Sequence, residues 1–109
     1  MMPTMEKEES NMKTEICSAI NSKQVIEFYY NGGTRLVEPF CYGIHKNTNN
    51  EVLSGYQASG YSESGESIGW KIFQTANISN LIITNEHFSG IREYYNPNDK
   101  AMTTIYCHV

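Results

Sequence analysis

Arginine and aspartate are nearly absent from this sequence of 109 residues, since Arg35 and Arg92 are the only arginines and Asp99 is the only aspartate. This shortage excludes mechanisms that need several guanidinium groups or several aspartates. Lysine and arginine together number 8 against 12 acidic residues, which gives a net charge of −4. Proteins that grip long nucleic acid by neutralising its phosphates need a basic surface, so the charge argues against that function.

The cysteine pattern of a disulfide scaffold or a structural zinc site is also missing. Cys17, Cys41 and Cys107 are odd in number and widely spaced, with no Cys-x-x-Cys pair. We therefore expect reduced thiols in a cytoplasmic protein that holds no metal ion or other cofactor. No apolar run approaches the roughly 18 residues of a membrane span, and the acidic N-terminus is unlike a signal peptide, so we expect no membrane contact.

No arrangement of a catalytic nucleophile stands out in the sequence. The single aspartate lies near the C-terminus, and no phosphate loop of the Gly-x-x-x-x-Gly-Lys type is present. We therefore expect a protein that is not an enzyme. Charged residues make up only 18% and aromatic residues 12%, which is typical of a folded domain rather than a disordered chain.

Stretches rich in β-branched and aromatic residues alternate with turn residues and predict five strands. The Asn31-Gly32-Gly33 turn indicates a tight hairpin between the first two. Pro39 removes one ladder donor and predicts a bend or an edge in the second strand. The predicted strands cover residues 24–31, 34–45, 51–58, 70–75 and 78–84.

The segments around these strands have different compositions. Residues 1–12 are polar and predict a disordered leader, whereas Ile16, Ala19 and Ile20 form one apolar stripe and predict a short helix over 13–22. Glycine and serine are frequent over 59–69, which indicates a mobile loop. Residues 89–109 form a C-terminal extension that acts as an interface or a lid, and its last part, 101–109, is either a helix or a strand.

The fold class that this pattern predicts is mainly β: a small, Sm-like, five-stranded β-barrel over 13–88, with a short N-terminal helix and a C-terminal extension. The order of elements over residues 14–88 resembles the WYL domain family. The strongest part of the resemblance is the stretch Arg35-Leu36-Val37-Glu38-Pro39 after a hairpin. The other matching residues are Ala19-Ile20, Val25 to Tyr30, Leu53 with Tyr56, Lys71-Ile72-Phe73, and Ile78 with Leu81.

The resemblance implies a sensor domain that binds nucleic acid or a nucleotide-like ligand through a basic, aromatic surface and helps to form oligomers. The sequence departs from the family in two places. Glu51-Val52-Leu53 stands where the family has Trp-Tyr-Leu, and Lys71, Gln74 and Asn77 stand where the family carries arginines. Of these three positions only Lys71 carries a positive charge, which favours a small anionic ligand over a long nucleic acid.

Seven residues are candidate ligand-binding residues. Arginine and lysine bind phosphate, aromatic faces stack on bases, and a glutamine supplies a neutral donor. Several have structural alternatives: Arg35 pairs with Glu38 or another glutamate, Tyr56 and Trp70 pack in the core, and Lys71 is solvated. Tyr61 is a further candidate, as a lid residue in the loop. The seven candidates are Arg35, Tyr56, Trp70, Lys71, Gln74, Arg92 and Tyr94.

The leading hypothesis is a non-enzymatic module that senses or sequesters a nucleotide-like or short oligonucleotide ligand, as a homo-oligomer. Two alternatives stay open. One is a protein-interaction or oligomerisation module that docks a partner by its barrel edge and tail, without a small ligand. The other is a protein that binds single-stranded nucleic acid.

Overall fold

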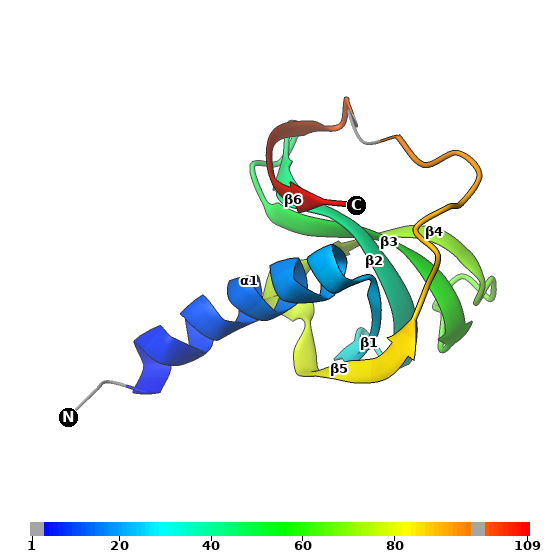
Figure 1. Cartoon of the computed structure of the whole chain (residues 1–109), viewed down its shortest axis with the longest axis horizontal. Coiled ribbons are helices and arrows are strands. Elements are labelled where there is room, and N and C mark those ends of the chain that lie inside the picture. Colours follow the sequence, from blue (N-terminus) through cyan, green and yellow to red (C-terminus); the bar gives the residue numbers. More distant parts are fainter. Residues whose placement is uncertain (1–3, 97–99) are drawn as a thin grey trace.

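The computed structural model describes the backbone of residues 4–96 and 100–109 and the side chains of residues 12–96 and 100–109. One antiparallel sheet and one helix form the molecule (Figure 1). The elements are α1 (Thr4–Ser22), β1 (Gln24–Tyr30), β2 (Gly33–His45), β3 (Glu51–Gly60), β4 (Gly69–Gln74), the 3₁₀ turn η1 (Thr75–Asn77), β5 (Ser79–His87) and β6 (Met102–His108). The mainly β fold class and the five predicted strands are confirmed.

The hairpin between β1 and β2 closes as its turn residues predict. Tyr30 pairs with Gly33, so Asn31 and Gly32 form a two-residue loop, and both have positive φ, 39° and 104°. A loop of this type needs two left-handed residues, and asparagine followed by glycine adopts them at least cost. The turn fixes the register of the two strands and thereby puts Arg35 opposite Phe28.

The strands are ordered β4-β3-β2-β1-β5, and β6 adds to β2 beyond the point where β1 leaves it. The long strand β2 therefore pairs with three neighbours. The register between β2 and β3 shifts between Pro39 and Cys41, which is the irregularity that a proline inside a ladder predicts. Among the described residues β4 pairs only with β3 and β5 only with β1, so hydrogen bonds do not close this sheet into a ring.

The helix is longer than the sequence predicted. It begins at Thr4, so residues 4–12 are helical instead of forming the predicted disordered leader, while residues 1–3 lie outside the described part. The stripe of Ile16, Ala19 and Ile20 is fully buried against the sheet, as its spacing requires. The N-terminal half of the helix extends away from the sheet (Figure 1). No described helix is long and apolar enough to cross a membrane.

The C-terminal extension resolves into a strap, residues 88–96, and a sixth strand. β6 pairs with Cys41 to His45 of β2, so the open choice between helix and strand is decided in favour of a strand. The prediction of five strands was short by this one. The strap crosses the aromatic face of β2 and β4, where Tyr95 contacts both Phe40 and Trp70.

A disulfide joins Cys17 of α1 to Cys107 of β6, with the two Cα atoms 5.7 Å apart. The prediction of reduced thiols was wrong for this pair, and Cys41 is the buried cysteine that lies outside the disulfide among the described residues. The cytoplasmic location was inferred from the cysteine pattern and loses that support, because disulfides persist in oxidising compartments.

Candidate functional site

The structure distributes the seven predicted site residues over three places. Arg35 and Lys71 line one cavity beside the turn of the first hairpin, and Lys71 also borders the cavity that Trp70 and Tyr94 line. Tyr56, Trp70, Arg92 and Tyr94 lie on the opposite face of the sheet, beneath or within the strap. Gln74 borders a third cavity, near the start of the described side chains of α1. The predicted residues therefore do not converge on one site.

Arg35 is buried on the inner face of β2, with only 4% of its surface exposed. Its Nη2 donates hydrogen bonds to the backbone oxygens of Tyr30, at 2.9 Å, and Asn31, at 3.3 Å. The rings of Tyr30, Tyr61 and Phe73 surround the guanidinium carbon at 5.3, 5.4 and 5.9 Å. The predicted pair with Glu38 does not form, and no ion pair involving Arg35 is found among the described residues.

Two buried polar atoms near Arg35 lack hydrogen-bond partners. They are Nε of Arg35 and Oε1 of Gln57, the only such side-chain atoms in the described part of the chain. Gln57 pairs with Val37, two residues from Arg35 on the same face of β2, and its Nε2 donates to the backbone oxygen of Tyr61 at 2.8 Å. An unpaired buried donor costs about 1–3 kcal/mol, and the guanidinium of Arg35 keeps one N–H that no protein group in the described part of the chain accepts.

Lys71 holds the loop that covers this site. Its Nζ donates to the backbone oxygen of Glu66 at 2.7 Å and to Oγ of Ser62 at 3.4 Å. The hydroxyls of Ser62 and Ser64 lie 3.0 Å apart. The predicted mobile loop is thus tied to the strand that follows it, and its hydroxyls are presented near a lysine and a buried arginine.

These residues enclose an open cavity of about 270 Å³. Two cations, two serine hydroxyls and the side chain of Tyr30 contribute to its wall, and Glu63 is the carboxylate among its lining residues. Guanidinium, ammonium and hydroxyl groups donate to phosphate or carboxylate oxygens. The described lining of this cavity therefore suits a small anionic group. We call it the Arg35 cavity.

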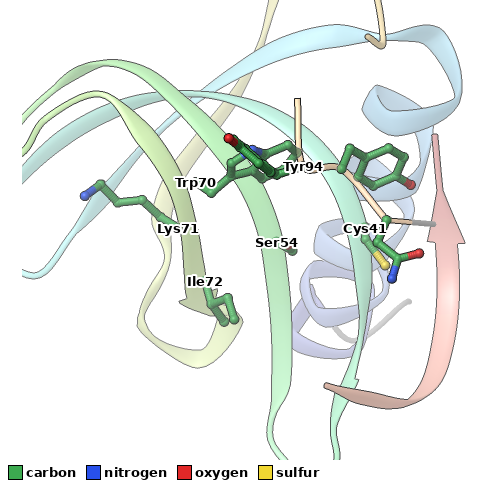
Figure 2. Close-up of a pocket in the computed structure, with 8 residues that line it drawn as sticks. Cys41, Ser54, Trp70, Lys71, Ile72 and Tyr94 are labelled. Carbon is green, nitrogen blue, oxygen red and sulfur yellow. The ribbon is translucent and has the colours of Figure 1, made fainter. Parts of the chain in front are cut away.

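Trp70 is not available to stack on a base. Its ring stacks on the Tyr95 ring, with the ring centres 5.9 Å apart. The rings of Phe40 and Tyr56 meet it edge-on, with centre distances of 4.9 and 5.8 Å. The indole N–H donates to the backbone oxygen of Glu93 at 2.8 Å. Trp70 and its neighbour Lys71 also point to opposite faces, as Figure 2 shows. The structural alternative, aromatic packing, describes Trp70 and Tyr56 better than base stacking does.

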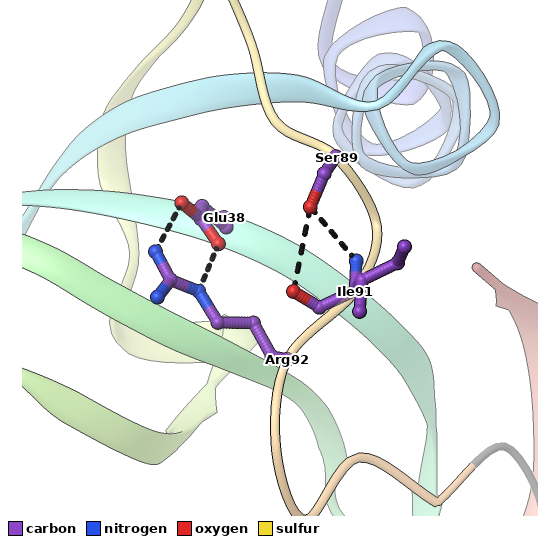
Figure 3. Close-up of polar contacts among 4 residues, drawn as sticks. All are labelled: Glu38, Ser89, Ile91 and Arg92. Atoms are coloured by element: carbon purple, nitrogen blue, oxygen red, sulfur yellow. Dashed lines mark hydrogen bonds and ion pairs between the residues drawn. The ribbon is translucent and has the colours of Figure 1, made fainter.

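Arg92 is engaged with protein groups rather than free for a ligand. Its Nε and Nη2 donate to the two carboxylate oxygens of Glu38, each at 2.9 Å, and its guanidinium lies 3.8 Å from the centre of the Tyr56 ring (Figure 3). The hydrogen bonds to Glu38 raise the pKa of Arg92 above its ordinary value. This pair anchors the strap to β2, and Ser89 supports the same segment by bonding the backbone of Ile91.

The two remaining candidates, Tyr94 and Gln74, lie outside the Arg35 cavity. Tyr94 is 90% exposed at the rim of the cavity that Trp70 lines. Gln74 is exposed, and its backbone N–H, not its side chain, makes a contact, by donating to the hydroxyl of Tyr30 at 3.0 Å. Neither residue contributes to the Arg35 cavity.

A second polar cluster was not predicted from the sequence. The carboxylate of Glu51 accepts hydrogen bonds from the hydroxyls of Tyr42, at 2.9 Å, and Tyr106, at 3.2 Å, while Nζ of Lys13 lies 3.7 Å over the Tyr106 ring. Burial and the Glu51 carboxylate raise the pKa of both tyrosines. Lys13, Tyr42 and Glu51 border an open cavity of about 720 Å³. The amine of Lys13 already covers the ring, so the cluster serves to fix α1 and β6.

Gln57 is the residue of the Arg35 cavity region that sequence reasoning missed. The inward positions of β3 are Leu53, Gly55 and Gln57, so strict alternation from Leu53 was the signal that could have found it. No group of three or more His, Cys, Asp or Glu side chains suited to a metal ion is found among residues whose positions are described.

Comparison with known proteins finds no matching family model, no matching curated protein and no matching solved structure. The resemblance to WYL domains therefore stays a prediction that rests on the residues quoted for it.

Proposed function

We propose that this protein is a non-enzymatic ligand-binding module that takes an anionic group, such as the phosphate of a nucleotide or short oligonucleotide, into the Arg35 cavity. The observation that carries the proposal is Arg35 itself. It is a cation with 4% exposure, an unpartnered Nε and no carboxylate partner among the described residues. Burying a charge without a counter-ion is costly, and an anionic ligand removes that cost.

The size of the cavity limits what it takes. About 270 Å³ is below the roughly 300–1,000 Å³ of pockets that enclose a whole organic ligand, so one phosphate group fits while the rest of the molecule lies outside. The Tyr61 ring, half exposed and 5.4 Å from the guanidinium carbon of Arg35, offers an exposed aromatic surface beside the cavity. It takes the stacking role for which the sequence favoured Trp70.

The same proposal includes four further properties. They are sensing or sequestering of the ligand, a homo-oligomeric state, a cytoplasmic location and an Sm-like barrel. The strand order and the 3₁₀ turn between β4 and β5 support the barrel. Only the cluster at Arg35 supports the ligand class, and the near-neutral charge of residues 16–109 supports a small ligand over long nucleic acid.

The first experiment asks whether the protein carries or binds such a ligand. Protein purified gently is denatured and the released small molecules are identified by mass spectrometry, and thermal shifts are then measured with inorganic phosphate and a panel of nucleotides. A released nucleotide, or a stabilising shift that saturates, supports the proposal. Absence of both contradicts it.

A matched pair of lysine variants locates the site. Lys71→Ala removes a cation of the Arg35 cavity, whereas Lys46→Ala removes an exposed lysine from the turn after β2. We expect Lys71→Ala to weaken phosphate binding about tenfold and Lys46→Ala to leave it unchanged. Equal effects of the two variants would mean that only the overall charge matters, which contradicts a site at Arg35.

A further inference from the structure

The edge strand β4 separates two cavities of opposite character. Phe73 lines the Arg35 cavity, and Trp70 lines a cavity of about 320 Å³ together with aromatic side chains of the strap (Figure 2). Lys71 and Ile72 border both cavities. We call the second one the Trp70 cavity. Its aromatic lining includes Tyr94 at the rim. A strand laid beside β4 would direct its alternate side chains to these two faces.

The outer edge of β4 is placed to accept such a strand. β4 pairs with β3 without a register shift, and β3 is its one neighbour among the described strands. The N–H of Gln74 bonds to the hydroxyl of Tyr30 and is therefore directed away from β3. Because amides two residues apart in a strand point to the same side, the N–H and C=O groups of Trp70 and Ile72 are directed to the open edge as well.

We propose that β4 binds an extended peptide from another protein as an added strand, with an acidic residue facing Lys71 and Arg35 between two apolar residues that face Trp70 and Ile72. Main-chain hydrogen bonds to Trp70 and Ile72 give affinity, and the two cavities give sequence preference. The acidic position rests on the proposed function, because it uses the same cations. The apolar positions do not, since they use the Trp70 cavity.

The sequence of the chain itself argues that the partner is not a second copy. An apolar–acidic–apolar triplet occurs only around Glu27 and, with proline as its last member, around Glu38. Both lie in strands that are already paired on both sides, β1 and β2. The other open edges among the described strands, β5 and β6, also lack the triplet, since β5 carries Glu86 between Asn85 and His87 and β6 holds no acidic residue.

Exposed apolar side chains next to the edge agree with a docking role. Ile68 is 61% and Ile72 is 50% exposed, one just before β4 and one within it. An added strand would cover both. Ile82 on the opposite edge strand β5 is 54% exposed and offers a control of the same residue type and exposure.

The test measures binding of a synthetic peptide with Phe-Glu-Phe at its centre by isothermal titration calorimetry and by amide hydrogen exchange of the protein. Two control peptides carry Phe-Lys-Phe, or Phe-Glu-Phe with N-methylated backbone amides. We expect binding of the first peptide, about tenfold weaker binding of each control, and slower exchange of the Ile72 amide. Failure of the Phe-Glu-Phe peptide to bind, or equal binding of the N-methylated one, overturns the proposal.

Variants separate this inference from the proposed function. Ile72→Glu should abolish peptide binding, and Ile82→Glu should change neither peptide nor phosphate binding. Lys71→Glu should reverse the preference toward Phe-Lys-Phe.

If phosphate binds and the peptide does not, the inference fails and the proposed function stands. If the peptide binds and phosphate does not, the proposed function fails in its small-ligand form. If the chain self-associates and Ile72→Glu prevents it, a second copy is the occupant and the inference is overturned.

Discussion

Arg92 and Glu38 are joined by two parallel hydrogen bonds, Nε to Oε1 and Nη2 to Oε2, each 2.9 Å long. The carboxylate side chain is 11% exposed and the arginine side chain 37% exposed. The pair connects the strap to the middle of β2, with the Tyr56 ring beneath the guanidinium. One of the two arginines is therefore a structural clamp, which leaves Arg35 as the one arginine in the proposed binding site.

Replacing Arg92 with alanine should loosen the strap without affecting the ligand. We expect Arg92→Ala to lower the free energy of unfolding by about 1 kcal/mol, because a bidentate pair is stabilising but solvent screens a partly exposed arginine. Urea denaturation measures the change, and Lys46→Ala is the matched control. Phosphate affinity should stay as in the parent protein. A large loss of affinity on Arg92→Ala would move the binding site to the strap.

The raised pKa of Tyr42 makes stability depend on pH in the alkaline range. Burial, together with the Glu51 carboxylate, raises the pKa of Tyr42 above its ordinary value of 10.0, so the folded protein keeps this hydroxyl protonated after the unfolded chain has lost the proton. The stabilisation is complete below about pH 10 and is lost as pH rises further. Urea denaturation from pH 8 to 11 should show a declining free energy of unfolding, and the decline should be shallower in Tyr42→Phe. Identical slopes in the two proteins would contradict the hydrogen bond to Glu51.

The disulfide leaves one cysteine outside it, Cys41. Thiol titration of unfolded, unreduced protein should count one reactive cysteine, whereas three would contradict the Cys17–Cys107 bond. Because the bond closes a loop of 90 residues, removing it in the double variant Cys17→Ser/Cys107→Ser should lower the free energy of unfolding by about 2–5 kcal/mol. Hydrogen exchange over β6 should increase most, since Met102 is its one buried residue and β2 its one strand neighbour among the described strands.

Local patterns predicted most of the fold. Asn31 and Gly32 specified the first hairpin, the alternation of apolar residues specified the strands, and the stripe at Ile16 specified the buried face of α1. The sixth strand and the disulfide depend on contacts between segments far apart in the sequence. Cys17 and Cys107 are separated by 90 residues. No local pattern indicates that β6 pairs with the part of β2 that lies beyond β1.

The site could be predicted only in part, for a reason of geometry. Arg35 and Lys71 meet because both lie on the inner face of their strands. Trp70 precedes Lys71 in the same strand, so alternation directs its side chain to the other face, away from Arg35. The partner of Arg92 was not predictable, because the strap that carries Arg92 has no regular structure whose period would place it opposite Glu38.

The most direct test of an anion site at Arg35 is the NMR signal of its side-chain Nε–H during titration with inorganic phosphate. The sequence contains two arginines, so the spectrum holds two such signals, and Arg92, already bonded to Glu38, is an internal control. Binding in the Arg35 cavity predicts a saturating shift of the Arg35 signal and of the Lys71 amide, with the Arg92 signal unchanged. A titration that leaves the Arg35 signal in place, or that moves only Arg92, would contradict the account.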